Sequence, residues 1–93
     1  MVDFEWDKNK ENKNRSKHNG VDFTEASTVF GDPFELTIPD PDHSDGEYRY
    51  ISMGRSSQGR VLVVSYTEVA QDRIRIISAR KAESHEKRQY ENG

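Results

Sequence analysis

The sequence predicts an α+β domain in which helices pack against an antiparallel β-sheet. Short segments that alternate apolar and polar side chains, as half-buried strands do, recur along the chain. The last three of these segments are separated by connections of hairpin length. Segments typical of helices lie before and after them. At 93 residues, the chain is expected to form a single domain over residues 1–93 with one core.

The N-terminal part is expected to hold two strands and two helices. Residues 2–6 alternate apolar and acidic side chains and predict the first strand. Asp7 is suited to cap a helix over residues 8–19, although that segment has no apolar face to bury. Residues 22–30 open with the capping-box pattern Asp-Phe-Thr-Glu and predict a second helix that packs on the core. Residues 34–38 alternate again and predict the second strand.

The C-terminal part predicts a meander followed by a helix. Two prolines and a glycine make residues 39–46 a loop. Strands are expected over residues 47–55, 60–68 and 72–79, with the continuously apolar middle one at the centre of the sheet. The polar segment 81–91 predicts a C-terminal helix. The element order is therefore β-α-α-β-β-β-β-α, with two N-terminal helices and one C-terminal helix.

The strand with the sequence Arg-Ile-Arg-Ile-Ile-Ser-Ala-Arg, residues 73–80, combines apolar side chains with three arginines. Successive side chains of a strand point to opposite faces. Ile74 and Ile76 are therefore expected to share a face with Ser78 and Arg80, and Arg75 to lie on the other face with Ala79. Arg80 would then end a largely buried face, either in a structural ion pair or as a functional cation.

Composition excludes several classes of protein. There is no cysteine, so disulfides and thiolate metal sites are excluded. No apolar run approaches the roughly 20 residues that cross a bilayer, and the N-terminus lacks a signal-peptide pattern. A cytoplasmic protein without a membrane partner is expected. Residues 1–47 hold five Lys/Arg against twelve Asp/Glu, and residues 48–93 hold nine against five, so the second half suits a polyanion.

No cofactor or metal is expected. The three histidines, His18, His43 and His85, show no ligand spacing, and the glycine-containing segment 54–59 lacks the lysine of a P-loop. Arginine pairs bidentately with phosphate oxygens, so the basic residues of the second half are candidates for a phosphate-binding surface. The alternative is that they form a solubility face. The basic set comprises Arg49, Arg55, Arg60, Arg73, Arg75, Arg80, Lys81, Lys87 and Arg88.

A series of short blocks carries a family resemblance over residues 4–90. The blocks are Phe4–Asp7, Lys17-His18, Gly20–Phe23, Glu25-Ala26, Val29-Phe30, Asp32-Pro33, Asp40–Ser44, Gly46-Glu47, Arg49, Gly54–Ser56, Gly59-Arg60 and Arg73–Arg80. In their order and coverage they resemble the BrnT family of bacterial toxins, the ribonuclease halves of type II toxin–antitoxin pairs. One departure is Asn19, which stands where the family usually has glycine directly after Lys-His.

The resemblance implies a RelE-like fold and metal-independent endonucleolytic cleavage of RNA, which inhibits translation and growth. In this reaction the ribose 2′-OH attacks the adjacent phosphate, which requires a base, an acid and cations around the phosphate oxygens. The expected roles are phosphate stabilisation in one shared pocket by Arg49 and Arg80, acid and base catalysis by Lys17, His18 or Glu47, and RNA backbone binding by Arg55, Arg75, Lys87 and Arg88.

Simpler roles remain open for two of these residues. Glu47 could form a salt bridge with Arg49 or Arg80, and His18 could be a cation at a helix C-terminus. The resemblance also implies a partner, a BrnA-like ribbon-helix-helix antitoxin that forms a hetero-oligomer with the toxin and binds operator DNA. The alternative function is a catalytically silent co-repressor, or another module that binds nucleic acid or antitoxin only.

Overall fold

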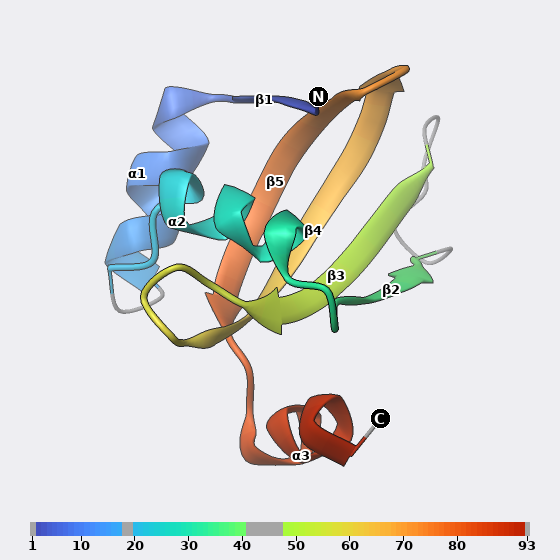
Figure 1. Ribbon diagram of the computed structural model, residues 1–93. Helices are drawn as coiled ribbons and strands as arrows, with labels where there is room; N and C mark the ends of the chain where they lie inside the picture. The colour runs from blue at the N-terminus through green and yellow to red at the C-terminus, as the bar shows by residue number, and fades with distance from the viewer. Residues whose placement is uncertain (1, 18–19, 41–47, 93) are drawn as a thin grey trace.

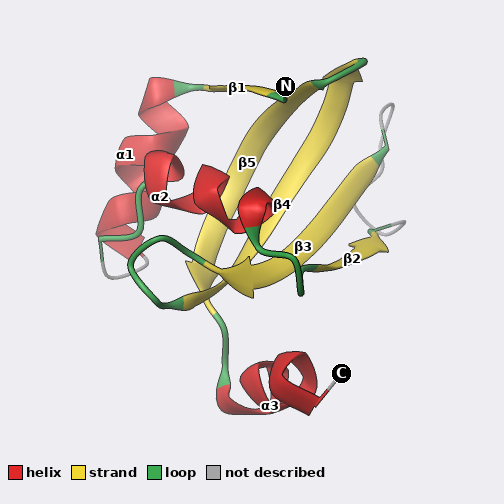
Figure 2. Cartoon of the chain, in the orientation of Figure 1, coloured by secondary structure: helices red, strands yellow, loops and turns green. Residues whose placement is uncertain are grey.

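The computed structural model describes residues 2–17, 20–40 and 48–92, which form a five-stranded sheet with helices packed against it (Figures 1 and 2). This confirms the predicted α+β class. The elements are β1 (Asp3–Trp6), α1 (Lys8–Lys17), α2 (Phe23–Ser27), the 3-10 helix η1 (Thr28–Gly31), β2 (Leu36–Pro39), β3 (Arg49–Arg55), β4 (Val61–Ala70), β5 (Arg73–Lys81) and α3 (Ser84–Asn92).

The strands lie in the order β1-β5-β4-β3-β2. Strands β3 to β5 form the predicted antiparallel meander, with the apolar β4 at the centre of the sheet as expected, and β2 pairs antiparallel to β3 at its edge. β1 departs from the antiparallel pattern, because it pairs parallel to β5, with Phe4 beside Ile74 and Trp6 beside Ile76. A parallel neighbour requires a crossover, and the segment that contains α1, α2 and η1 follows β1 on one face of the sheet.

The two faces of the sheet differ in what covers them. One face, called here the covered face, packs against α1, α2 and η1 (Figure 1). Its core cluster consists of the buried residues Val21, Phe23, Ala26, Val29, Leu62, Val64, Ile76 and Ala79. The opposite face, called here the open face, packs a smaller cluster of Met53, Val61 and Val63 against Tyr90 of α3 at one end only. The side chains that this arrangement leaves accessible are candidates for function.

Polar contacts attach α1 to the sheet, which explains how a helix without an apolar face is stable. Asp7 caps it as predicted, accepting the N–H of Asn9 at 2.8 Å. The buried Glu11 carboxylate accepts the N–H of Phe23 at 2.9 Å. The side chain of Asn14 accepts the N–H of Ala79 at 3.0 Å and donates to the carbonyl of the same residue at 2.8 Å. Asn14 therefore behaves like one residue of a neighbouring strand at the edge of β5.

The second predicted helix is shorter than expected. Asp22 caps α2 by accepting the N–H of Glu25 at 2.7 Å, but α2 ends at Ser27 and continues as η1. The hydroxyl of Thr28 donates to the carbonyl of Glu25 at 2.6 Å, and side-chain bonds of this kind compete with regular helical ones. Glu25 does not complete a capping box, because its carboxylate is bound by Arg60 and Ser56.

A β-bulge in β5 corrects the predicted facing of Arg80. Ser65 of β4 pairs with Ser78, whereas the next residue, Tyr66, pairs with Ile76, so Ile77 has no partner on β4. One extra residue reverses the side-chain alternation beyond it. Arg80 therefore lies on the open face, and Ala79 joins the core of the covered face. The expectation that Arg80 shares a face with Ile74 and Ile76 was wrong.

Among the described residues, each helix is too short or too polar to span a bilayer.

Candidate functional site

A row of three charged side chains and one threonine crosses the open face through four neighbouring strands. Arg49 on β3 pairs with Thr67 on β4, Thr67 pairs with Arg75 on β5, and Arg75 pairs with Glu5 on β1. Residues that pair across a sheet point to the same side, so Arg49 and Arg75 both project from the open face. Their Cα atoms lie two strands apart, at about 10 Å. Thr67 between them is small, and its hydroxyl donates to the carbonyl of Tyr48 at 2.7 Å. Arg49 and Arg75 are called here the cationic strip, and Glu5 lies at its end.

A carboxylate orients part of this strip. The Nε of Arg75 donates to Oε2 of Glu5 at 2.9 Å, and the Nε of Arg73 lies 4.0 Å from Oε1 of the same residue. The side chains of Arg75 and Glu5 are 46% and 38% exposed, so water screens the pair and it adds little to stability. The terminal nitrogens of Arg75 form no bond to Glu5, and they are accessible to an anion.

Arg80 lies at the other end of the open face, where it is bound to α3. Its Nη1 and Nη2 donate to the two oxygens of Glu86 at 2.7 and 2.9 Å. The ion pair with Arg80 lowers the pKa of Glu86 to about 2, and the N–H of Glu83, which donates to Glu86, adds to this effect. The same ion pair raises the pKa of Arg80. Within the described residues, the Nε of Arg80 has no hydrogen-bond acceptor. Glu86 thus fixes the guanidinium plane and leaves one of its edges unused.

Arg49 and Arg80 lie on the same face but not in one pocket. Arg49 pairs with Thr67 and Arg80 with Val63, four residues apart on β4 and on opposite sides of it. Strand geometry puts their Cα atoms about 16 Å apart. The cavity that Arg80 lines does not include Arg49. The expected shared pocket is therefore wrong, and the arginine nearer to Arg49 on this face is Arg75.

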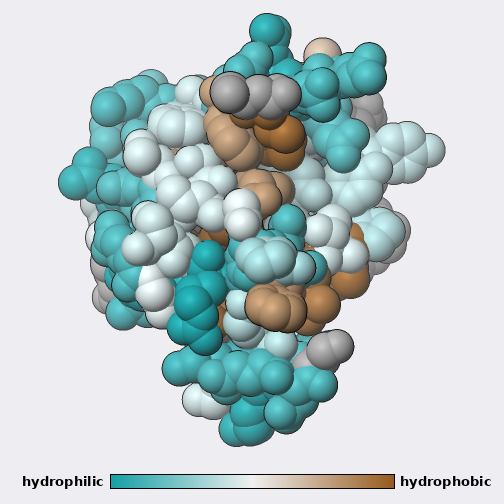
Figure 3. Space-filling model, viewed as in Figure 1, coloured by the Kyte–Doolittle hydropathy of each residue, from teal (hydrophilic) through white to brown (hydrophobic). Residues whose placement is uncertain are grey.

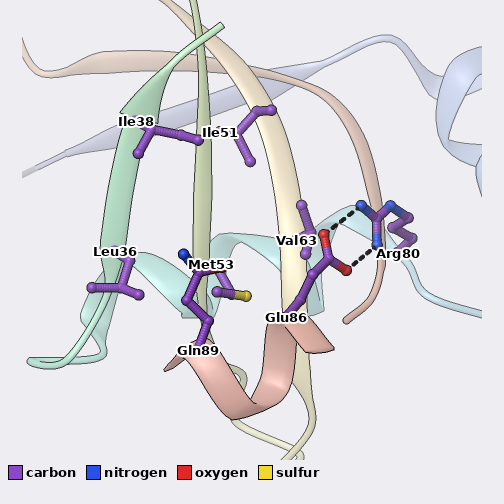
Figure 4. A pocket seen from close by; sticks show the side chains of 8 residues that line it. All are labelled: Leu36, Ile38, Ile51, Met53, Val63, Arg80, Glu86 and Gln89. Atoms are coloured by element: carbon purple, nitrogen blue, oxygen red, sulfur yellow. Dashed lines mark hydrogen bonds and ion pairs between the residues drawn. The ribbon is translucent and has the colours of Figure 1, made fainter. Parts of the chain in front are cut away.

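The cavity beside Arg80 is mostly apolar (Figure 4). It has a volume of about 170 Å³ and lies between β2, β3 and β4 on one side and α3 on the other. The bidentate pair of Arg80 and Glu86 forms one wall, as the dashed lines in Figure 4 show. The remaining lining residues are Leu36, Ile38, Ile51, Met53, Val63 and Gln89.

Arg55 belongs to a third cluster, at the end of β3. Its backbone N–H donates to Oδ2 of Asp32 at 2.7 Å, its Nη1 donates to the carbonyl of Gly59 at 2.9 Å, and its guanidinium lies 5.9 Å from the ring centre of Tyr90. The Tyr90 hydroxyl also donates to Asp32, which raises the pKa of Tyr90. The backbone N–H of Arg55 and the Tyr90 hydroxyl lower the pKa of Asp32 despite its burial. This cluster connects α3 to the chain after η1.

The structure places the other expected site residues as follows. Lys17 ends α1, one turn beyond Asn14, and is exposed at the end of the sheet where Arg80 lies. Lys87 and Arg88 are exposed on α3. His18 and Glu47 lie outside the described residues, so their expected roles have no structural counterpart here.

Arg60, one of the basic set, is structural. Its Nε donates to Oε2 of Glu25 at 2.9 Å, its Nη2 donates to Oε1, and only 2% of the Glu25 side chain is exposed. The guanidinium of Arg60 holds the pKa of Glu25 below its usual value. Glu86, by contrast, pairs with Arg80 in the candidate site, and the sequence did not indicate it. The available signal was an acidic residue one short loop after the arginine-rich strand. Within the described residues, no group of His, Asp and Glu could hold a metal ion.

Comparisons with known proteins agree with the family resemblance found in the sequence. A family model described as "Ribonuclease toxin, BrnT, of type II toxin-antitoxin system" matches residues 6–86. Among solved structures, the chain is similar to the crystal structure of the Brucella abortus ribonuclease toxin BrnT, with a TM-score of 0.69 and 21% sequence identity over 90% of this chain and 100% of that one. No curated protein matches the chain. At this identity the structural likeness supports the fold, and the family model supports the family.

Proposed function

The chain belongs to the BrnT family of ribonuclease toxins of type II toxin–antitoxin systems, and on that premise we propose that it cleaves a single RNA strand bound across its open face. The observation that carries the proposal is the presence of Arg49, Arg75 and Arg80 on the face that α1 and α2 leave uncovered. Arginine groups spaced along a sheet suit the repeated phosphates of a single strand.

The proposed reaction is transesterification within the RNA. The ribose 2′-OH loses its proton to a base and attacks the adjacent phosphorus, and the bond to the 5′-oxygen breaks as an acid donates a proton to that oxygen. The products are a 2′,3′-cyclic phosphate and a 5′-hydroxyl. Negative charge increases on the phosphate oxygens in the transition state, and guanidinium donors stabilise it there. In this scheme no metal ion takes part.

Arg80 is assigned to the reacting phosphate because its unused Nε edge and the exposed Lys17 lie at the same end of the sheet. Arg49, with Arg75, is assigned to a neighbouring phosphate, since the two ends of the face are too far apart for one anion. Lys17, His18 and Glu47 remain the candidates for acid and base. Arg55, Lys87 and Arg88 lie around α3 and would bind the outer backbone.

The test is to incubate the purified protein with single-stranded RNA in the presence of excess EDTA and to analyse the ends of the products. Cleavage that leaves 2′,3′-cyclic phosphates is expected. Cleavage that requires added Mg²⁺, or products with 3′-hydroxyl ends, would overturn the mechanism.

One observation favours a catalytically silent module as a second candidate. Both Arg75 and Arg80 are already paired with carboxylates, Glu5 and Glu86. Such a module would bind RNA with strong salt dependence and cleave none. The same EDTA experiment separates the two candidates.

We also propose a ribbon-helix-helix antitoxin as the partner. Type II systems supply an antitoxin, and a DNA-binding antitoxin would carry the toxin to operator DNA as a hetero-oligomer. Co-purification of the two chains on an operator fragment tests this arrangement.

A further inference from the structure

Two large apolar side chains are exposed at the edge of the sheet. Phe34, just before β2, is 74% exposed, and Ile38 on β2 is 58% exposed. β2 is an edge strand with no neighbour on its outer side among the described residues. Figure 3 shows brown hydrophobic surface along this edge, above the teal C-terminal helix. Exposed apolar side chains grouped in this way on a small domain mark an interaction surface.

These side chains border two neighbouring hollows, called together the β2 groove. Ile38 lines the 170 Å³ cavity, Phe34 and Tyr90 line a more open hollow of about 680 Å³, and Leu36 lines both. In Figure 4 the side chains of Leu36 and Ile38 and of Ile51 and Met53 line the cavity, with Gln89 of α3 opposite. The β2 groove is defined here by Phe34, Leu36, Ile38, Ile51, Met53, Gln89 and Tyr90.

The charged residues that line the β2 groove are three glutamates and two arginines. Glu86 and Glu91 of α3 line its two hollows, and Glu35 lines the larger one. Against them stand Arg80, which is already paired with Glu86, and Arg55. Because Arg80 and Glu86 neutralise each other, Glu35 and Glu91 against Arg55 leave one net negative charge along the groove, which attracts Lys and Arg side chains. The groove therefore differs from the cationic strip on the rest of the open face.

We propose that the β2 groove is the docking surface for the antitoxin, through a segment that has apolar side chains flanked by Lys or Arg. The proposal rests on the proposed function only in taking this chain to be the toxin of a toxin–antitoxin pair. β2 has four residues and ends at Pro39, which has no N–H to donate, so main-chain pairing along this edge is short. Apolar side chains that enter the two hollows supply most of the affinity.

Docking at this surface also explains neutralisation. A segment in the β2 groove contacts Glu86 and lies beside Arg80, so it closes the end of the open face where the reacting phosphate is proposed to bind. The antitoxin then blocks RNA without competing for the strip of Arg49 and Arg75. One surface thus provides both affinity and inhibition.

The test is the binding of the purified cognate antitoxin to four forms of the toxin, measured by equilibrium titration. These forms are the wild type, Ile38→Lys, Ile38→Glu and the matched control Val69→Lys. Val69 is exposed at the far end of β4, so its variant adds the same charge away from the groove. Ile38→Lys is expected to weaken binding about 30-fold or more, as loss of a central contact does. Ile38→Glu is expected to weaken it less, because glutamate attracts the basic flanks, and Val69→Lys is expected to bind like the wild type.

Cleavage of RNA by the free toxin is measured on the same proteins, together with their thermal stability. The proposal stands if folded Ile38→Lys loses the antitoxin but cleaves RNA normally, or if no form cleaves RNA and only the Ile38 variants lose the antitoxin. In the second case the proposed function fails and the docking surface does not. Equal antitoxin binding by all four forms overturns the proposal. Loss of RNA cleavage by Ile38→Lys also overturns it, because the groove would then belong to RNA. The proposal is likewise overturned if the wild type is a dimer that Ile38→Lys dissociates while still binding the antitoxin.

Discussion

The guanidinium of Arg80 and the carboxylate of Glu86 form a bidentate ion pair that links the end of β5 to α3. A carboxylate presents two oxygens to arginine in the same way as a phosphate does. The pair therefore places a negative charge beside the guanidinium on the open face and holds the guanidinium in one orientation. Because α3 buries none of its residues fully, this pair and the Tyr90–Asp32 bond are its main specific contacts.

Replacement of Arg80 is predicted to abolish cleavage without unfolding the protein. Arg80→Ala should lower kcat about 100- to 1,000-fold, as loss of one transition-state donor does. Arg80→Lys keeps the charge but not the planar guanidinium, so its kcat should lie between those of the wild type and Arg80→Ala. The ion pair is partly exposed, so unfolding free energy should fall by about 1 kcal/mol or less. Single-turnover cleavage and chemical denaturation measure the two effects, and a fully active Arg80→Ala protein would remove Arg80 from the site.

The matched control is Arg60→Ala, which removes a guanidinium from the covered side. Glu25 would remain buried without its main partner. A loss of about 2–3 kcal/mol of stability is expected, below the range for fully buried pairs because Arg60 is partly exposed. Below its melting temperature, the folded variant should keep its rate of cleavage.

Acid should weaken the contact between α3 and the sheet. The pKa of Glu86 is lowered from 4.5 to about 2 in the folded protein. A carboxyl whose pKa is depressed by folding contributes stability above its unfolded pKa, and this contribution is lost as pH falls through the folded pKa. The melting temperatures of wild type and Glu86→Gln, measured from pH 6 to pH 2, should therefore converge as the pH falls from about 4.5 to about 2. Parallel curves for the wild type and Glu86→Gln would contradict the prediction.

Asn14 is predicted to be essential for attaching α1. Its amide donates to the carbonyls of Ala79 and Val21 and accepts the N–H of Ala79. Asn14→Ala leaves these buried groups unpaired and should cost about 2–3 kcal/mol. Asn14→Asp should cost at least as much, since a carboxylate then faces two carbonyl oxygens. Urea denaturation measures both, and the exposed Asn12→Ala should change stability by less than about 0.5 kcal/mol.

Gly54 is predicted to be required for the packing of η1 on β3. A Cβ at this position would lie 2.9 Å from Cγ1 of Val29 and 3.2 Å from Oδ2 of Asp32. Gly54→Ala should therefore destabilise the protein by about 1–3 kcal/mol. Gly31→Ala is the control, because a Cβ there meets nothing within 4 Å. Equal melting temperatures for the two variants would show that Val29 can move aside.

Much of the fold could be read from local patterns. Asp7 and Asp22 cap helices as their positions indicated, and the apolar run of β4 is the central strand. The end of the second helix was missed, because side-chain bonds such as that of Thr28 compete with helical ones and give no periodic signal. The parallel pairing of β1 was missed because it depends on a crossover and not on the strand's own residues.

The candidate site was predictable in residue type but not in arrangement. Arginines on β3 and β5 were expected to bind phosphate, and the structure separates Arg49 from Arg80 along the face. It also assigns Arg60 to Glu25 and Arg80 to Glu86. Charge patterns show that cations are present, but the partner of each one depends on contacts between residues distant in the sequence.

The sequence by itself determined the strands, the helix starts and the family, because these depend on side-chain alternation, capping residues and ordered motifs within short segments. Only the tertiary structure decided which way Arg80 points. One residue without a partner on β4, Ile77, reverses the facing of the residues that follow it in β5, and this bulge is a property of how β5 pairs with β4. The exposure of Ile38 and Phe34 likewise follows from β2 being an edge strand, which is a property of the assembled sheet.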